Sequence, residues 1–581
     1  MSATDLNRLI VEAAEFDLPR CQNTYGVAPC TASGAAGSEC YYGWITCQDK
    51  PNYNVGVYTH KFCGRGNPLP LGQLCRPYIT EIDSSPTELD PENGLGRRAL
   101  TTLRMIDEPD PDYELDPHVA TRPAAPQGTY LSRLFARNPY YAGRGARVKR
   151  ALFKPDSNGG IGYTLSDPEF VTESFIIDGV KKNRGEFILT LKDILKLADR
   201  VKVPAPTAGK LAVDLGINDL SLTLGAGQGS LYPASGYIRR GDEVIQYTAN
   251  SGDVLSWADG TYRAKFGTSA AAGKTGDGVQ LCQVWVAQPF STVMKDLLNL
   301  ADITDASIDT AQLVSEDNVW LGDKYKITVC LTDPDGVSAL IAELCQHSGS
   351  AIWVSTAEQK VKFKVIGPRS PAEVAQKTLT DEANVRRGSV KVTTLDNLRI
   401  NLAGIFYGLK SATANRREQK NYGLPPEIYI DTDARSANEY GDRRDKIEYS
   451  RFFGAANTSA MQILMSRRIA YYRDAPKDID LEVDPQDQSI DVGDLVDLST
   501  RYLPGVTGAP ETTRCLVTKR EHKGKHLALR LRTTVFARRY AFIGANSQPD
   551  YLSASSAQRE YAYICNSNGK MSNGDEPYRI I

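Results

Sequence analysis

The segment "CQNTYGVAPCTASGAAGSECYYGWITC", residues 21–47, places Cys21, Cys30, Cys40 and Cys47 close together in the chain. Their spacing is C-x8-C-x9-C-x6-C. Structural zinc sites usually begin with a C-x2-4-C pair, which this segment lacks. Iron–sulfur clusters also use thiolates, commonly four, and tolerate wider loops because the inorganic core is larger. The spacing therefore leaves open an iron–sulfur cluster, disulfides or free thiols, and it favours zinc least.

The residues between the cysteines suit a loop that wraps around a cofactor. Glycine and proline let the backbone turn and approach a bound group closely. Such residues are Gly26, Pro29, Gly34, Gly37 and Gly43. Aromatic side chains could shield a cluster from water, and the segment offers Tyr25, Tyr41, Tyr42 and Trp44.

The whole chain has an ordinary globular composition of 581 residues, 41% hydrophobic, with a formal net charge of −2. This length suggests roughly three to five domains. The near-neutral charge argues against strong attraction to nucleic acid, although it leaves open contact with DNA that passes through a protein channel. No apolar run approaches the ~18 residues that span a bilayer.

The N-terminus, "MSATDLNRLIVEAAEFD", does not read as a signal peptide, because it lacks a basic start and contains acidic residues. We expect a short amphipathic helix here, with Leu6, Leu9, Ile10 and Ala13 on one side. The chain is then expected to fold in a reducing cytoplasm, which makes disulfides less expected.

Beyond the cysteines the pattern is mainly β. Strands are predicted at 175–177 and 186–191, typical of a small barrel, and Gly-Asp and Ser-Gly turns predict an all-β insertion. Helical spacing appears in "STVMKDLLNLADI" and in "DPDGVSALIAELCQHSG", where Gly349 is the expected stop, and a hairpin "AIWVS…KVKFKVI" follows. β patterns return after residue 380, interrupted by the helix "SAMQILMSRRIAYYR" and ending in a hairpin that turns at 522–525. No fixed-period repeat is present.

The sequence gives only weak evidence for other binding or catalytic sites. "GTSAAAGKT", residues 267–275, has five residues where a phosphate-binding loop has four, and a strand pattern follows it instead of a helix. The acidic run "DIDLEVDPQDQSIDVGD" lacks the glycine and final glutamate of a calcium-binding loop. Cys345 and His347 are two apart on a predicted helix, so their side chains diverge. We therefore expect these segments to be structural.

The cysteine segment, together with "FCGRGNPLPLG" after it, resembles the cysteine-rich domain of siphophage tail-tip proteins of the lambda minor tail protein type. The resemblance covers residues 15 to about 80. It implies a [4Fe-4S] cluster bound by Cys21, Cys30, Cys40 and Cys47, with Cys63 and Cys75 left over. The gap between the second and third cysteines is shorter here than in the family. This departure bears on the second pair of ligands, for which Cys63 could substitute.

The order of the later segments resembles the hub proteins of phage tail tips and baseplates, most clearly in "SGYIRRGDEVIQYT" and "KFGTSAAAGKTGDGVQ". The domains expected from this resemblance are an N-terminal helix with the iron–sulfur domain (1–80), a first hub β-barrel (81–204), an all-β insertion (205–290), an α+β domain (291–380), a second hub β-barrel (381–535) and a C-terminal extension (536–581).

The resemblance implies a non-enzymatic virion protein, assembled in the host cytoplasm and located at the tail tip. As a homotrimeric hub ring it would continue and close the tail tube and open for DNA ejection. It would contact a distal tail protein, the tape-measure protein and central tail-tip or fibre proteins, without stable membrane insertion. The cluster would act as a structural staple. The alternatives are a cytoplasmic iron–sulfur electron carrier or redox enzyme, for which no second cofactor motif is present, and a secreted disulfide-rich binding protein.

Overall fold

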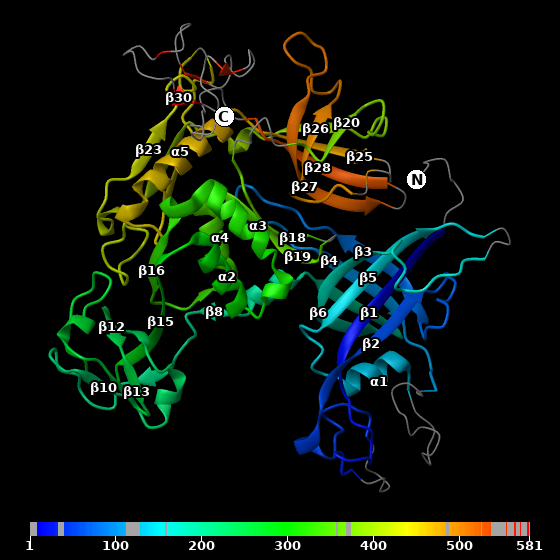
Figure 1. Cartoon of the computed structure of the whole chain (residues 1–581), viewed down its shortest axis with the longest axis horizontal. Coiled ribbons are helices and arrows are strands. Elements are labelled where there is room, and N and C mark those ends of the chain that lie inside the picture. Colours follow the sequence, from blue (N-terminus) through cyan, green and yellow to red (C-terminus); the bar gives the residue numbers. More distant parts are fainter. Residues whose placement is uncertain are drawn as a thin grey trace.

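The protein is mainly β, with its strands divided among several sheets and few helices (Figure 1). None of the helices in the part of the chain that is described has the length and apolar character needed to cross a membrane. The computed structural model describes residues 9–32, 40–111, 128–156, 160–355, 358–367, 374–437, 439–483, 487, 489–523, 526–535, 553–554, 563–564, 570 and 578–579.

Seven strands close into a barrel in the order β1-β2-β3-β4-β7-β6-β5, drawn in blue and cyan in Figure 1. Inward-facing residues such as Phe16, Phe62 and Leu189 are completely buried in one core. The helix α1 (Tyr130–Arg137) packs its apolar side, including Leu134, into the same core. The strands are β1 (Leu9–Cys21), β2 (Val55–Gly64), β3 (Arg76–Ser85), β4 (Leu100–Ile106), β5 (Gly145–Phe153), β6 (Val171–Asn183) and β7 (Glu186–Lys192).

The strand β1 occupies the place where an N-terminal helix was predicted. It pairs with β2 on one side and β5 on the other. Ala14, Phe16 and Leu18 alternate along it and face the barrel core, whereas Ala13 is buried in a smaller cluster outside the barrel. The helix prediction was wrong because an apolar spacing of this kind also fits a strand with both faces buried. The barrel therefore begins before the cysteine segment, which connects β1 to β2.

Residues 205–290 carry several short strands around a buried ion cluster. Glu243 accepts hydrogen bonds from Arg263 at 2.6 and 2.8 Å and from Arg240 at 3.2 Å. Both arginines also donate to the carbonyl of Ala271 or Ala272, within the loop once compared with a phosphate site. That loop leads into a strand. The strands of this region are β9 (Gly209–Lys210), β10 (Ser221–Thr223), β11 (Gly236–Arg240), β12 (Glu243–Tyr247), β13 (Ala249–Ser251), β14 (Val254–Ser256) and β15 (Gly278–Gln288), and β8 (Lys202–Val203) directly precedes the region.

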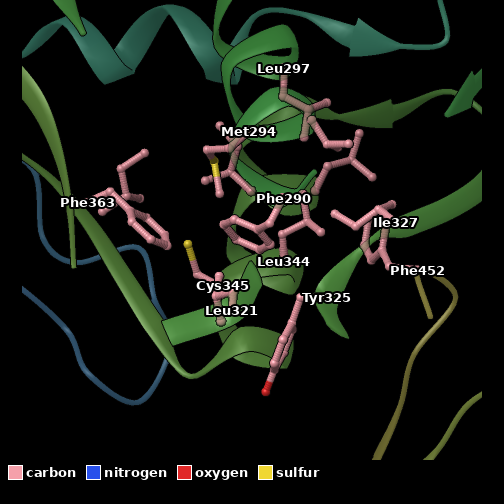
Figure 2. Close-up of a cluster of buried hydrophobic side chains, with 14 of the residues drawn as sticks. Phe290, Met294, Leu297, Leu321, Tyr325, Ile327, Leu344, Cys345, Phe363 and Phe452 are labelled. Atoms are coloured by element: carbon pink, nitrogen blue, oxygen red, sulfur yellow. The ribbon is translucent and has the colours of Figure 1, made fainter. Parts of the chain in front are cut away.

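Helices and a hairpin pack together in one hydrophobic core, part of which Figure 2 shows. Phe290 and Met294 of α2 (Phe290–Leu300) meet Leu344 of α4 (Val337–Ser348) and Phe363 of β19 (Lys360–Val365), and all four are essentially buried. Gly349 ends α4 at φ 67°, which confirms the predicted stop. The hairpin prediction is also confirmed. The other elements are α3 (Thr310–Glu316), β16 (Ile327–Leu331), β17 (Asp335–Gly336) and β18 (Ser350–Ser355).

The C-terminal β region forms an open sheet where a second closed barrel was predicted. Its order is β20-β26-β27-β28-β25-β21, and its two outer strands do not pair with each other. The prediction was wrong because the chain leaves this sheet after β21 to form a separate sheet, β23-β22-β24, covered by α5 (Thr458–Tyr472). The strands are β20 (Lys377–Thr380), β21 (Lys391–Thr394), β22 (Leu402–Phe406), β23 (Glu427–Ile430), β24 (Asp445–Tyr449), β25 (Lys477–Val483), β26 (Leu495–Ser499), β27 (Thr513–Lys523), β28 (His526–Thr533), β29 (Tyr563–Ile564) and β30 (Tyr578–Arg579).

The predicted C-terminal hairpin is confirmed as β27 and β28; its turn at 524–525 lies outside the described residues. Most of the expected extension at 536–581 lies outside them as well.

The segment between β3 and β4, residues 86–99, ties the barrel to the rest of the molecule, and we call it the strap. Its Leu89 N–H donates to the carbonyl of Thr518 in β27 at 2.7 Å. Its Gly94 carbonyl accepts from the N–H of Ile352 in β18 at 2.8 Å. Two carboxylates of the strap also pair with arginines of β28: Glu88 with Arg530 and Glu92 with Arg532.

Candidate functional site

The four cysteines of the β1–β2 connection line one small pocket. Its walls are formed by Cys21, Asn23, Tyr25, Cys30, Ala32, Cys40, Tyr42, Cys47, Gln48, Asp49 and Tyr53. The cavity that the pocket encloses is small, about 20 Å³, and it opens to solvent. All four thiols are half-buried. The structure thus brings together every residue of the predicted ligand set.

Short turns bring the four cysteines to the pocket. Cys21 ends β1, and its N–H donates to the carbonyl of Tyr42 at 2.8 Å, which holds the first cysteine against the turn that follows Cys40. The Cys30 N–H donates to the carbonyl of Val27 and closes one turn. The Cys47 N–H donates to the carbonyl of Trp44 at 3.3 Å and closes a second, weaker turn. The Tyr42 N–H lies 3.4 Å from the Cys40 sulfur and donates to it. An N–H that points at a sulfur stabilises the thiolate form, as a metal-binding cysteine requires.

Asp49 holds the two halves of the loop together, and the sequence reasoning missed it. Its carboxylate accepts the Thr31 N–H at 2.8 Å and the Thr31 hydroxyl at 2.9 Å, directly after Cys30. It also accepts from the Asn52 side chain in the 3-10 helix η1 (Lys50–Asn52). These hydrogen bonds keep the pKa of Asp49 below its ordinary value. The sequence signal was an aspartate followed by Lys-Pro, a common helix start.

The predicted aromatic shield is present in part. Tyr25 and Tyr42 line the pocket, together with Tyr53, which was not predicted. Trp44 does not line it; its side chain is 46% exposed and packs edge-on against Tyr53 at 5.2 Å. Tyr41 is turned towards α1, where the Arg137 guanidinium lies 3.7 Å from its ring centre. The last contact anchors the loop to the barrel.

The four thiols are close enough to affect one another electrostatically. Burial raises the pKa of Cys40 and of Cys47, and negative charge on neighbouring cysteines raises both further. Burial raises the pKa of Tyr53 as well, again with a contribution from charge on the cysteines. Four thiolates in one pocket therefore repel each other, and a bound cation would offset this repulsion.

The chemistry of the four thiols can be compared with that of the two metal groups they could bind. A Zn–S bond of ~2.3 Å would bring the four sulfurs to within about 4 Å of each other. In the part of the chain that is described, no three His, Cys, Asp or Glu side chains are gathered tightly enough to hold one ion. Thiolates are the donors that iron–sulfur clusters use, commonly four of them. The residues present therefore fit the group that the resemblance implies.

The two left-over cysteines lie elsewhere. Cys63 and Cys75 are buried together in the apolar cluster outside the barrel. Neither belongs to the walls of the four-cysteine pocket. In this conformation Cys63 does not replace any of the four predicted ligands.

The other candidate sites are structural in this fold. Lys274 and Thr275, at the end of the former phosphate-loop candidate, both bind Asp214. Cys345 and His347 are buried on α4, and burial lowers the pKa of His347. Asp480 in the acidic run pairs with Arg530 across the C-terminal sheet.

No protein-family model matches this chain, and no curated protein matches it by sequence. Several solved structures are similar to it. A tail protein from Neisseria meningitidis MC58 is 10% identical, covers 79% of this chain and 91% of its own length, and has a TM-score of 0.35. The prophage MuSo2 43 kDa tail protein from Shewanella oneidensis is 11% identical, covers 78% and 97%, and has a TM-score of 0.33. A chain of a gene transfer agent virion is 13% identical, covers 57% and 83%, and has a TM-score of 0.34. These neighbours are tail and virion proteins, but at such scores they establish neither fold nor function.

Proposed function

We propose that this chain is a structural protein of a bacteriophage tail tip or baseplate, a trimeric hub whose β1–β2 loop is stapled by a [4Fe-4S] cluster. The observation that carries the proposal is the single pocket lined by Cys21, Cys30, Cys40 and Cys47. It places together the same four residues that the resemblance to tail-tip proteins selects from eleven cysteines.

The cluster would stabilise a loop with little apolar packing of its own. Val27, Trp44 and Ile45 are each about half exposed, at 56%, 46% and 47%. Because this surface is not buried, the loop gains little from the hydrophobic effect. Cys21 ends a barrel strand, so bonds from its sulfur would fix the loop directly to the barrel. The cluster supplies these bonds when it is bound; the chain supplies the thiols, the N–H donor to Cys40 and the Asp49 clamp.

An exposed apolar sheet face supports an assembly role. Ile428 and Ile430 of β23 and Ile447 of β24 are 46%, 50% and 46% exposed. Gly404 of β22 lies between Ile428 and Ile447, which leaves the face flat. Contiguous apolar surface of this kind marks protein interfaces. We assign it to a second copy of this chain within the hub ring.

Anaerobic purification of the full chain tests the cluster. We expect about four iron and four sulfide per chain, with visible absorption from thiolate-to-iron charge transfer. Replacing Cys30 or Cys40 by serine should lower iron several-fold and make residues 21–53 sensitive to protease. The matched control is Cys515→Ser, at a thiol buried in the C-terminal sheet, which should leave the iron content unchanged. Iron-free wild-type protein would refute the cluster and leave the hub assignment standing.

The oligomeric mass tests the hub. We expect a trimer in solution, converted largely to monomer by the double substitution Ile428→Lys and Ile447→Lys, because charge on a buried interface is costly. Val506→Lys, at a fully exposed residue away from that sheet, is the control and should leave the trimer intact. A monomeric wild-type protein that loads iron and turns over electrons would instead identify a carrier.

A further inference from the structure

Tyr42, between the third and fourth cysteines of the pocket, has a backbone conformation that residues with side chains rarely adopt. Its φ angle is 58°, in the left-handed region, which glycine enters readily but which costs free energy for any other residue. Such a conformation persists only where the surrounding contacts enforce it, and residues of this kind concentrate at functional sites. The contacts of Tyr42 therefore indicate which function the conformation serves.

Both polar groups of the Tyr42 backbone bind a cysteine of the pocket. The Tyr42 N–H donates to Cys40 Sγ at 3.4 Å, and the Tyr42 carbonyl accepts the N–H of Cys21 at 2.8 Å. The same carbonyl accepts a longer hydrogen bond, of 3.4 Å, from the hydroxyl of Tyr53, which also lines the pocket. Tyr42 thus makes backbone hydrogen bonds to two of the four cysteines, and a change of its φ angle would disturb both.

The Arg20 guanidinium holds the Tyr42 side chain. Arg20 lies on β1 directly before Cys21, and its guanidinium carbon is 4.8 Å from the centre of the Tyr42 ring and 4.7 Å from that of the Tyr58 ring on β2. Both distances are within the range of cation–π attraction. In the part of the chain that is described, Arg20 pairs with no carboxylate, so its charge is not neutralised there. The ring contact ties the turn at Tyr42 to β1 and β2.

We propose that Arg20 and Tyr42 are the positioning pair of the four-cysteine site. The Arg20 guanidinium holds the Tyr42 ring, and this contact offsets the free-energy cost of the left-handed backbone. The Tyr42 backbone in turn holds Cys40 and Cys21 in the positions that a bound group requires. The inference rests on the proposed binding of an iron–sulfur cluster by the four cysteines, and it adds to them two residues that bind no metal themselves.

The same pair affects the electrostatics of the site. A hydrogen bond to a ligating sulfur and a nearby positive charge both stabilise the more negative, reduced form of an iron–sulfur cluster, and so raise its reduction potential. Tyr42 supplies the hydrogen bond to Cys40, and Arg20 supplies the charge next to Cys21. Loss of either residue should therefore lower the reduction potential, which a residue that only stabilises the loop would leave unchanged.

The test uses the full-length protein, purified without oxygen, and measures the rate of iron release to a chelator and the reduction potential. We expect Arg20→Met and Tyr42→Ala to release iron about tenfold faster than the wild-type protein and to have a lower reduction potential. Tyr42→Phe keeps the ring and should behave as the wild-type protein does. Lys50→Met is the matched control, because the Lys50 ammonium lies 5.4 Å from the ring centre of Trp44, which does not line the pocket. It should release iron at the wild-type rate.

Tyr42→Gly separates the role of the backbone from that of the ring. Glycine removes the ring but adopts a φ of 58° without the cost, so iron release should be slower than in Tyr42→Ala and faster than in the wild-type protein. Amides of β4 and β7 should exchange as in the wild-type protein in every variant, which shows that the barrel stays folded.

An iron-free wild-type protein would overturn the proposed cluster and this inference with it. An iron-loaded wild-type protein whose release rate and potential are unchanged in Arg20→Met and Tyr42→Ala would overturn this inference alone. Iron release from Tyr42→Gly at least as fast as from Tyr42→Ala would also overturn it, because the left-handed backbone would then not control the site.

Discussion

Replacing Glu243 by alanine is expected to lower the stability of the 205–290 region by about 3–5 kcal/mol, because it leaves buried Arg263 without its counter-ion and leaves Arg240 with only a longer ion pair, to Asp277 at 3.7 Å. The Glu243 side chain is completely buried, and those of Arg263 and Arg240 are 3% and 7% exposed. The carboxylate also accepts the N–H of Ala271 at 3.2 Å, so the same change frees a loop amide. The favourable interactions with Arg263 hold the pKa of Glu243 below its ordinary value despite burial.

Local hydrogen exchange measures this effect better than whole-chain unfolding, since a multidomain chain does not unfold in one step. Amides of β11, β12 and β15 should exchange at least roughly a hundredfold faster in Glu243→Ala, and amides of β27 and β28 should not change. The control is Asp214→Ala, which removes an exposed ion pair with Lys274 in the same region and should leave protection nearly unchanged. Unchanged exchange in Glu243→Ala would contradict the assigned role of the ion cluster.

Lowering the pH from 6.5 to 4.5 is expected to destabilise the barrel through His60. Its imidazole is buried, and its Nδ1 lies 2.9 Å from the Tyr130 hydroxyl. Burial, and after it the positive charges of Arg76 and Arg20, lower the pKa of His60 to about 3, against the opposing charge of Asp17. The unfolded chain binds a proton below about 6.5, but the native barrel does not. The contribution of His60 is therefore complete above pH 6.5 and is lost as pH falls towards 3.

The size of this effect follows from the pKa difference. At 1.36 kcal/mol per unit, the full loss is on the order of 5 kcal/mol, with roughly 2–3 kcal/mol between pH 6.5 and 4.5. Asp193, at the end of the barrel, acts in the opposite direction. Burial raises its pKa to about 6, so its contribution is present at low pH and is lost as pH rises through 6. The difference between the wild-type protein and a His60 variant therefore gives the contribution of His60 to the pH dependence of stability.

The variant His60→Gln keeps a hydrogen-bonding side chain beside Tyr130 and removes the titrating group. Hydrogen exchange of the barrel amides in urea, corrected for the intrinsic rate at each pH, should show a flatter dependence in the variant. His347→Gln, at a buried histidine outside the barrel, should keep the wild-type slope. Parallel pH profiles for wild-type protein and His60→Gln would show that His60 does not control barrel stability.

The elements predicted correctly are those with local signals. The hairpin of β18 and β19 and the helix α4 with its Gly349 stop follow from neighbouring residues alone. A helix was predicted in place of β1, and this prediction was wrong. Both faces of β1 are buried by residues more than thirty positions away in the chain, which the local spacing does not encode. The prediction of a second closed barrel was wrong because strand patterns indicate how many strands there are but not whether the two outer strands pair with each other.

The same division holds for the candidate site. Cysteine spacing and glycine content pointed to one loop around a common space, and the structure places the four thiols around such a space. The spacing did not reveal Asp49, because its role depends on Thr31, which is brought to it only by the folded loop. Trp44 was expected to cover the pocket, but aromatic residues in a segment do not disclose which way each one turns.

The strap has a mechanical consequence. It leaves the barrel after β3, docks on β18 and β27, and returns to the barrel at β4, so both of its ends belong to the first unit while its middle belongs to the others. A torque applied to the barrel would thus reach the C-terminal sheet through this loop, whose two arms are joined by the Glu88–Arg97 backbone hydrogen bond of 2.9 Å. The barrel and the C-terminal sheet should therefore rotate together as one rigid body. A force applied to the barrel would be transmitted to the C-terminal sheet.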